Sequence, residues 1–195
     1  IIAALGVLLS NTAVVIGAML ISPLHWAMYA FAISIITSRR HLASKAAINF
    51  AVSIATTLII SILITGIFPL PSVTPEIQLR TQPTLLDLGI ALASSVIGAA
   101  SLYFPRISKS ITGVAIAIAL MPALAVVGIG LQLGNWAVTQ GSALLFLTNV
   151  MAIVFGGVVT LYLLNFRPRY EKEKQRFRIG LLTAAGVLIL ISVPL

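Results

Sequence analysis

The first 37 residues of the chain, Ile1 to Thr37, contain no Asp, Glu, Lys or Arg. A continuous helix of that length would run about 55 Å, well beyond the roughly 30 Å hydrocarbon core of a bilayer. The sequence Ser-Asn-Thr at 10–12 interrupts the run with residues that favour a helix start. We therefore expect a spanning helix to begin near Asn11 or Thr12, with residues 1–9 ending an earlier segment. The alternative is a re-entrant hairpin that turns at 10–12.

The composition excludes an ordinary soluble domain. Apolar residues make up 59% of the chain and charged residues 8%, whereas soluble domains carry about 25% charged residues. We expect a multi-pass integral membrane protein of a prokaryotic plasma membrane. The absence of cysteine excludes disulfides and thiolate metal sites, and we expect no metal and no cofactor. Because the chain starts at Ile1 without methionine, we also expect an upstream region.

Apolar runs long enough to cross a bilayer predict an all-α transmembrane helix bundle of six spans, in a single domain of residues 1–195. The spans cover residues 12–37, 46–68, 86–104, 111–133, 140–166 and 179–195.

The basic residues predict the orientation of the bundle. Eleven of the twelve Lys and Arg residues lie in the first, third and fifth connectors, 38–45, 105–110 and 167–178. The twelfth, Arg80, lies in the second connector, on the opposite side of the membrane in this topology. The positive-inside bias places these three connectors in the cytoplasm. We interpret the run 167–178 as a helical extension near anionic headgroups rather than a nucleic-acid site.

Two spans reach a proline near their middle, in VIGAMLISPL before His25 and in VAIAIALMPA. The prolines are Pro23 and Pro122, and proline removes a helical hydrogen bond. Their offset of 99 residues also superposes the second span on the fifth. We predict a 3+3 inverted repeat, about 11–104 and about 110–195, with Pro-broken first helices near a binding site. The alternative is a chance coincidence of two kinks.

Polar residues within or beside the spans are the candidates for a solute pathway. An ionisable His25 within a span indicates a solute or proton role, or else a neutral packing role. Thr84 and Asp87 have the form of a capping box, and the alternative for Asp87 is an outward-facing cation or proton site. Asn149 favours packing, with a polar pathway second. The full candidate set is Asn11, Ser22, Pro23, His25, Asp87, Ser94, Ser95, Pro122 and Asn149.

Four blocks of the sequence resemble the uncharacterised hydrophobic domain family, a DUF-type family of bacterial and archaeal membrane proteins. The blocks are NTAVVIGAMLISPL (11–24), LLDLGIALASSVIGAAS (85–101), ITGVAIAIALMPALAVVG (111–128) and GSALLFLTN (141–149). This chain has His25 and Trp26 where the family tends to have a second proline, and Pro122-Ala123 where it has Pro-Pro. The resemblance implies a separate cytoplasmic domain in many members and no established substrate.

The function that these features favour is a transporter or channel for a small solute or ion, with a pathway near helix breaks at Pro23 and Pro122. The alternative is a non-transporting oligomeric scaffold, or an anchor and transducer for a cytoplasmic domain, which the scarcity of intramembrane charge favours. We expect no enzyme, because the chain has no HExxH, GxSxG, acidic pair or phosphate loop. The expected partners are membrane lipids, a small solute or ion and further copies of the chain.

Overall fold

The computed structural model describes residues 1–21, 24–37, 39–68, 73–104, 109–166 and 171–192. For 20–21, 24–26, 40, 109–119, 171–174 and 176 it describes the backbone alone. Within these ranges the chain forms helices and no strands, which confirms the predicted all-α fold. The helices are α1 (Ile2–Leu8), α2 (Thr12–Ile21), α3 (Leu24–Thr37), α4 (Arg40–Ile67), α5 (Pro75–Gln78), α6 (Leu85–Tyr103), α7 (Lys109–Gln132), α8 (Trp136–Leu163) and α9 (Glu171–Ser192).

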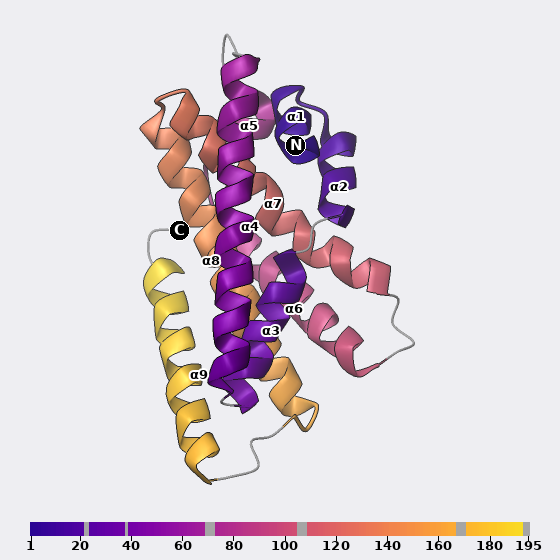
Figure 1. Ribbon diagram of the computed structural model, residues 1–195, viewed down its shortest axis with the longest axis vertical. Coiled ribbons are helices and arrows are strands. Elements are labelled where there is room, and N and C mark those ends of the chain that lie inside the picture. Colours follow the sequence, from indigo (N-terminus) through magenta and orange to yellow (C-terminus); the bar gives the residue numbers. More distant parts are fainter. Residues whose placement is uncertain (22–23, 38, 69–72, 105–108, 167–170, 193–195) are drawn as a thin grey trace.

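Helix α8 is the central element of the bundle, and α3, α6, α7 and α9 pack against it (Figure 1). Gly156 of α8 lets α6 approach closely. A Cβ atom on Gly156 would lie 1.9 Å from Ser95 Oγ of α6, whereas one on Gly157 would make an ordinary contact of 3.5 Å with the Cβ atom of Ala32 on α3. Small residues serve the same purpose at many helix interfaces in membranes.

Successive long helices alternate in direction (Figure 1). As drawn, α3 descends, α4 rises, α6 descends, α7 rises, α8 descends and α9 rises. The first residues of α4 and α9 therefore lie at the lower end of the bundle, whereas α5 lies at the upper end. This arrangement puts Arg39, Lys45 and Arg178 toward one end and Arg80 toward the other. The cytoplasmic identity of the lower end stays a prediction.

The described parts of the predicted spans lie mainly on helices. Among the described residues, His41–Ile67, Leu85–Tyr103 and Trp136–Leu163 are each long and apolar enough to cross a membrane. Shorter apolar segments cover the other three, at Ala27–Thr37, Leu120–Gln132 and Phe177–Ser192. These helices indicate a membrane protein, and the number of six crossings stays a prediction.

Several helix boundaries differ from the predicted spans, and two of them concern the basic connectors. Helix α4 begins at Arg40, so most of the predicted connector 38–45 is helical. Helix α9 begins at Glu171, which confirms a helical extension over the second part of 167–178.

Helices α1 and α2 form a short hairpin at the upper end of the bundle (Figure 1). Ser10 has a φ of 53°, and the backbone N–H groups of Ser10 and Asn11 donate to carbonyls of the last turn of α1. The Asn11 Oδ1 atom then accepts from the N–H of Val14 at 3.2 Å and caps α2. The predicted helix start is therefore correct, and residues 2–8 fold back on α2 as the hairpin alternative predicts.

The structure describes only one of the two prolines. Helix α2 ends at Ile21 and α3 begins at Leu24, and Ser22 and Pro23 between them lie outside the described residues. The predicted break at Pro23 therefore stays a prediction. Helix α7, in contrast, continues through Pro122. The predicted break at Pro122 is therefore wrong. The proline costs one hydrogen bond and some steric strain, which packing of α7 against α4, α6 and α8 offsets. The inverted repeat stays a prediction.

Candidate functional site

Polar residues recur at every fourth position along α4, and we call this series the α4 polar row. Its members are His41, Lys45, Asn49, Ser53, Thr57, Ser61 and Thr65. Because an α-helix has 3.6 residues per turn, each member lies about 40° further round the helix than the one before. The row therefore winds from one face of α4 to another along its length.

The exposure of the row changes as it winds. Lys45 is exposed and Ser53 is half-buried, whereas Ser61 and Thr65 are each only 1% exposed. At the buried end α7 lies close to α4, because a Cβ atom on Gly128 would lie 2.7 Å from the Cβ atom of Ser61. The row thus leads from the open lower part of α4 into its contact with α7.

A groove of about 560 Å³ lies beside the lower half of the row, between α3 and α4. We call it the lower groove. Its polar lining residues are Lys45, Asn49 and Ser53, all from the row. Its remaining lining is apolar and comes from Ala27 and Ala30 of α3 and from Leu42, Ala46 and Val52 of α4.

A second cavity of about 250 Å³, the upper cavity, lies where α1, α4 and α7 meet. Helix α7 contributes Met121 and Ala125, on either side of Pro122 in the sequence. Val52 and Ser53 line both the upper cavity and the lower groove. The other lining residues are Ile1, which precedes α1, Ala3 and Ala4 of α1, and Thr56, Thr57, Ile60 and Ser61 of α4. The two hollows therefore adjoin each other along the α4 polar row.

The hydroxyl groups of the row bond to their own helix. The Ser53 hydroxyl donates to the Asn49 carbonyl at 2.8 Å, and the Thr57 hydroxyl donates to the Ser53 carbonyl at 2.8 Å. These bonds satisfy the donors inside α4, as apolar surroundings require. The hydroxyl oxygens retain lone pairs that a water molecule or a solute in the cavities can use.

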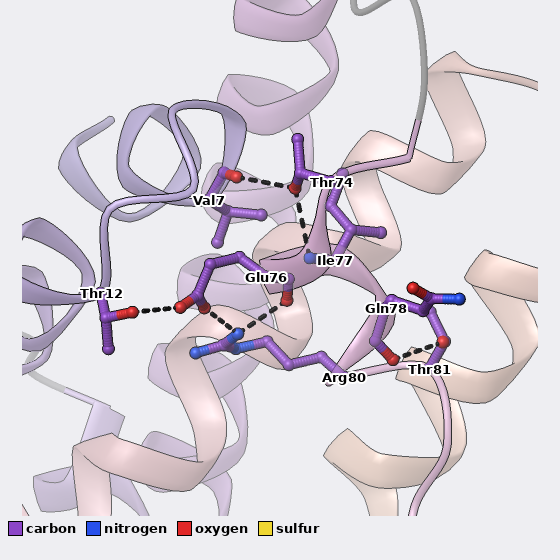
Figure 2. A network of polar contacts seen from close by, with 8 residues as sticks. All are labelled: Val7, Thr12, Thr74, Glu76, Ile77, Gln78, Arg80 and Thr81. Carbon is purple, nitrogen blue, oxygen red and sulfur yellow. Dashed lines mark hydrogen bonds and ion pairs between the residues drawn. The ribbon is translucent and has the colours of Figure 1, made fainter.

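A second polar cluster, the Glu76 network, joins α1, α2 and α5 at the upper end of the bundle (Figure 2). The Thr12 hydroxyl donates to the Glu76 carboxylate, and the Arg80 guanidinium forms an ion pair with the same carboxylate. Arg80 also donates to the Glu76 carbonyl at 2.7 Å. The Thr74 hydroxyl donates to the carbonyl of Val7 at 3.1 Å. The network holds the α1–α2 hairpin, and α1 is one wall of the upper cavity.

The carboxylate of Glu76 is buried and remains ionised. Burial by itself raises the pKa of Glu76, but the hydrogen bond from Thr12 and the charge of Arg80 outweigh burial. The pKa of Glu76 therefore lies below its ordinary value of 4.5. With both carboxylate oxygens engaged, Glu76 supports the hairpin rather than binding a solute.

The predicted candidates near the first proline fall where the side chains are not described. Ser22 and Pro23 lie outside the described residues, and His25 lies in the first turn of α3 with only its backbone described. Their predicted roles stay predictions.

Two further candidates cap helices. Asn11 caps α2, as above, and Thr84 and Asp87 form the predicted capping box at the start of α6. The Asp87 carboxylate accepts from the Thr84 N–H at 2.9 Å, and the Thr84 hydroxyl accepts from the Asp87 N–H at 3.3 Å. The favoured interpretation of Asp87 is confirmed.

The remaining candidates do not form one site. Ser94 and Ser95 are buried in α6, and Asn149 is buried in α8. Ser95 faces Gly156 of α8 and donates to the Leu92 carbonyl at 2.6 Å, so it belongs to the contact between α6 and α8. Neither cavity described above is lined by these residues. In the described part of the chain, no three His, Asp or Glu side chains gather as a metal site would require.

Sequence reasoning missed the two polar assemblies that the structure forms. The four-residue repeat of polar side chains within a span was the available signal for the α4 polar row. The Glu76 network had two signals in the sequence. Glu76 and Arg80 are opposite charges four residues apart, and they follow Thr74-Pro75, a pair that favours a helix start.

The long apolar helices define the class of protein: a helical membrane protein with several apolar helices. One of them, α4, carries the polar row beside the two cavities. The chain belongs to the family described as Domain of unknown function (DUF389), whose sequence model matches residues 19–155. This match confirms the predicted DUF-type family.

A curated relative is consistent with this assignment. The chain is 29% identical over 178 residues to an uncharacterized protein of Methanocaldococcus jannaschii. The alignment covers 90% of this chain and 55% of the relative, so the chain spans about half the length of the curated relative it matches. No solved structure matches the chain significantly.

Proposed function

We propose that this protein is a transporter or channel for a small solute or ion, and that its pathway follows the α4 polar row. The observation that carries the proposal is that the row lines two adjoining cavities, which share Val52 and Ser53. Met121, beside Pro122, lines the upper cavity, and Ala27 of α3 lines the lower groove. The proposed pathway is therefore near Pro122, and its predicted proximity to Pro23 stays a prediction because Pro23 lies outside the described residues.

The polarity of the row supports this proposal. Polar groups on a membrane-spanning helix usually face a bundle interior or a water-filled cavity, because lipid offers them no partners. The row places an amine and an amide at its open end and hydroxyl groups further in. A solute that moved along α4 would meet a polar group at every turn.

The alternative is a non-transporting scaffold, or an anchor and transducer for a cytoplasmic domain. One observation favours it: no acidic residue lines either described cavity, whereas ion-coupled carriers commonly use acids within their spans. The longer relative has room for a further domain. This function predicts that α4 does not contact water at mid-membrane.

Cysteine labelling separates the two functions. The chain has no cysteine, so Ser53→Cys and Thr57→Cys each introduce a single thiol. Matched controls are Ile59→Cys and Leu63→Cys, because these residues of the same helix are 57% and 59% exposed but line neither cavity. The protein is reconstituted in vesicles and treated with a membrane-impermeant thiol reagent.

A pathway predicts that the thiols at 53 and 57 are modified at least about tenfold faster than those at 59 and 63, because only the ionised thiolate in water reacts. Equal, slow modification at all four positions in folded protein would contradict the proposed pathway and favour the scaffold.

A further inference from the structure

We infer that the lower groove binds an anionic group, a phosphate or a carboxylate, through Lys45 and Asn49. The inference gives the charge class of the solute at the mouth of the proposed pathway, and as a step in transport it rests on the proposed function. As a binding site it can be measured without flux.

The two donors are adjacent and available. Residues four apart on a helix are neighbours, with Cβ atoms about 5–6 Å apart. Lys45 and Asn49 both line the groove and are both exposed. Neither side chain has a hydrogen bond or an ion pair with any described residue. An oxyanion placed between them would accept from an ammonium and an amide, and hydrogen bonds to charged groups are the stronger kind.

The third polar residue of the groove, Ser53, is consistent with anion binding at Lys45 and Asn49. The Ser53 hydroxyl already donates to the Asn49 carbonyl at 2.8 Å, so it offers an oxygen acceptor rather than a free donor. Donors for an anion therefore concentrate at Lys45 and Asn49. This places recognition at the open lower part of α4 and not deeper along the row.

The charged residue that lines the lower groove favours an anion over a cation. Helix α4 packs mainly against α1, α3 and α7, and none of these four helices contains Asp or Glu. Among the chain's four acids, the two whose side chains are described, Glu76 and Asp87, belong to α5 and α6 and line neither cavity. Among the described side chains, a cation in the lower groove would therefore meet the Lys45 ammonium and no carboxylate of the lining, whereas an anion would be attracted.

The groove also has room for more than a bare ion. Its volume of about 560 Å³ falls within the range of ordinary small-molecule sites, and three of its eight lining residues are alanine. Two sources supply an anionic group of this kind: a free solute from water, or the headgroup of an anionic lipid lying against the helices. The chemistry at Lys45 and Asn49 is the same for both.

The test uses the whole protein in nanodiscs and measures its thermal unfolding midpoint. In one arm, inorganic phosphate is titrated into phosphatidylcholine nanodiscs at constant ionic strength, since screening alone weakens exposed charge interactions. In the other arm, phosphatidylglycerol replaces part of the phosphatidylcholine. Lys45→Gln removes the charge and Lys45→Arg retains it. Arg178→Gln is the matched control, because it removes one exposed positive charge from α9, outside the groove.

A saturable rise of the midpoint is expected with one of the two probes. Lys45→Gln should weaken the apparent affinity by about tenfold or more, the effect of losing one charged hydrogen bond, while Lys45→Arg and Arg178→Gln keep it. A response to phosphate assigns the site to a free anion, and a response to phosphatidylglycerol alone assigns it to a lipid headgroup.

Two results would overturn the inference: no saturable response to either probe, or the same response in the parent protein and Lys45→Gln. Each variant's midpoint without a probe shows whether it folds. The proposed pathway has its own test, the thiol labelling at positions 53 and 57. Absence of an anion site would therefore not by itself exclude transport.

Discussion

At the scale of single residues, the two acids whose side chains are described hold the structure together. Glu76 ties the α1–α2 hairpin to the segment before α6 through Thr12 and Arg80. Asp87 closes a capping box with Thr84. Both carboxylates are engaged by local donors, so neither lines the cavities beside α4.

Glu76 makes the stability of the upper end dependent on pH. Because its pKa is lower in the folded protein than the ordinary value of 4.5, its contribution is complete above that value and is lost as the pH falls through the folded pKa. Glu76→Gln should lower the free energy of unfolding near neutrality by about 1–3 kcal/mol. It should also flatten the fall of the unfolding midpoint between about pH 5 and pH 3.

The control for this measurement is Gln82→Ala, a neutral change at an exposed position in the same connector. It should keep the acid dependence of the parent protein. An unchanged acid profile in Glu76→Gln would show that the carboxylate does not contribute as described.

The capping box predicts a coupling between its two members. Thr84→Ala and Asp87→Ala should each destabilise the fold by about 1 kcal/mol, the usual effect of losing an N-cap. Because the two side chains satisfy each other's backbone, the double variant should lose less than the sum of the single variants. Additive losses in a double-mutant cycle of unfolding free energies would show that the box does not act as a unit.

At the scale of helices, close contacts depend on missing side chains. The contact between α6 and α8 needs Gly156, because any Cβ atom there would overlap Ser95 Oγ at 1.9 Å. Gly89 on α6, in contrast, has no atom within 4 Å of a built Cβ.

This contrast gives a matched pair of substitutions. Gly156→Ala should lower the free energy of unfolding by about 1–3 kcal/mol through overpacking. Gly89→Ala should raise it by about 0.5–1 kcal/mol, because alanine favours a helix more than glycine does. Thermal or denaturant unfolding of both variants checks the prediction, and Ser95→Gly should partly rescue Gly156→Ala. A loss of similar size in both variants would contradict the described contact.

The helices themselves follow from the sequence more fully than their breaks do. Apolar runs predict where helices lie, since lipid demands that every backbone group be satisfied within the chain. The outcome at Pro122 did not follow, because the packing of α7 against three neighbours decides whether a proline breaks a helix. The start of α4 at Arg40 is another such case, since charged residues continue a helix beyond the apolar run.

At the scale of the whole molecule, the candidate site depends on which helices become neighbours. The sequence shows that α4 carries a polar side chain at every fourth residue, but not that α3, α1 and α7 enclose successive parts of that row. Residues singled out one by one, such as Asn11 and Asp87, were caps. The polar residues of α4 that line the cavities recur every four positions. This spacing identifies a site only when it is known that α3 and α7 pack against α4.

The most direct test of the proposed pathway is a flux measurement with proteoliposomes that carry Thr57→Cys or Leu63→Cys. Permeability to chloride, phosphate, potassium and glycerol is compared before and after modification of the thiol. A pathway along α4 predicts a flux above that of empty liposomes for at least one of these probes. Modification at position 57 should reduce this flux by about tenfold, and modification at 63, which lines neither cavity, should leave it unchanged. Folded protein that passes none of the four probes, or a flux that modification at 57 and at 63 reduces equally, would contradict the account.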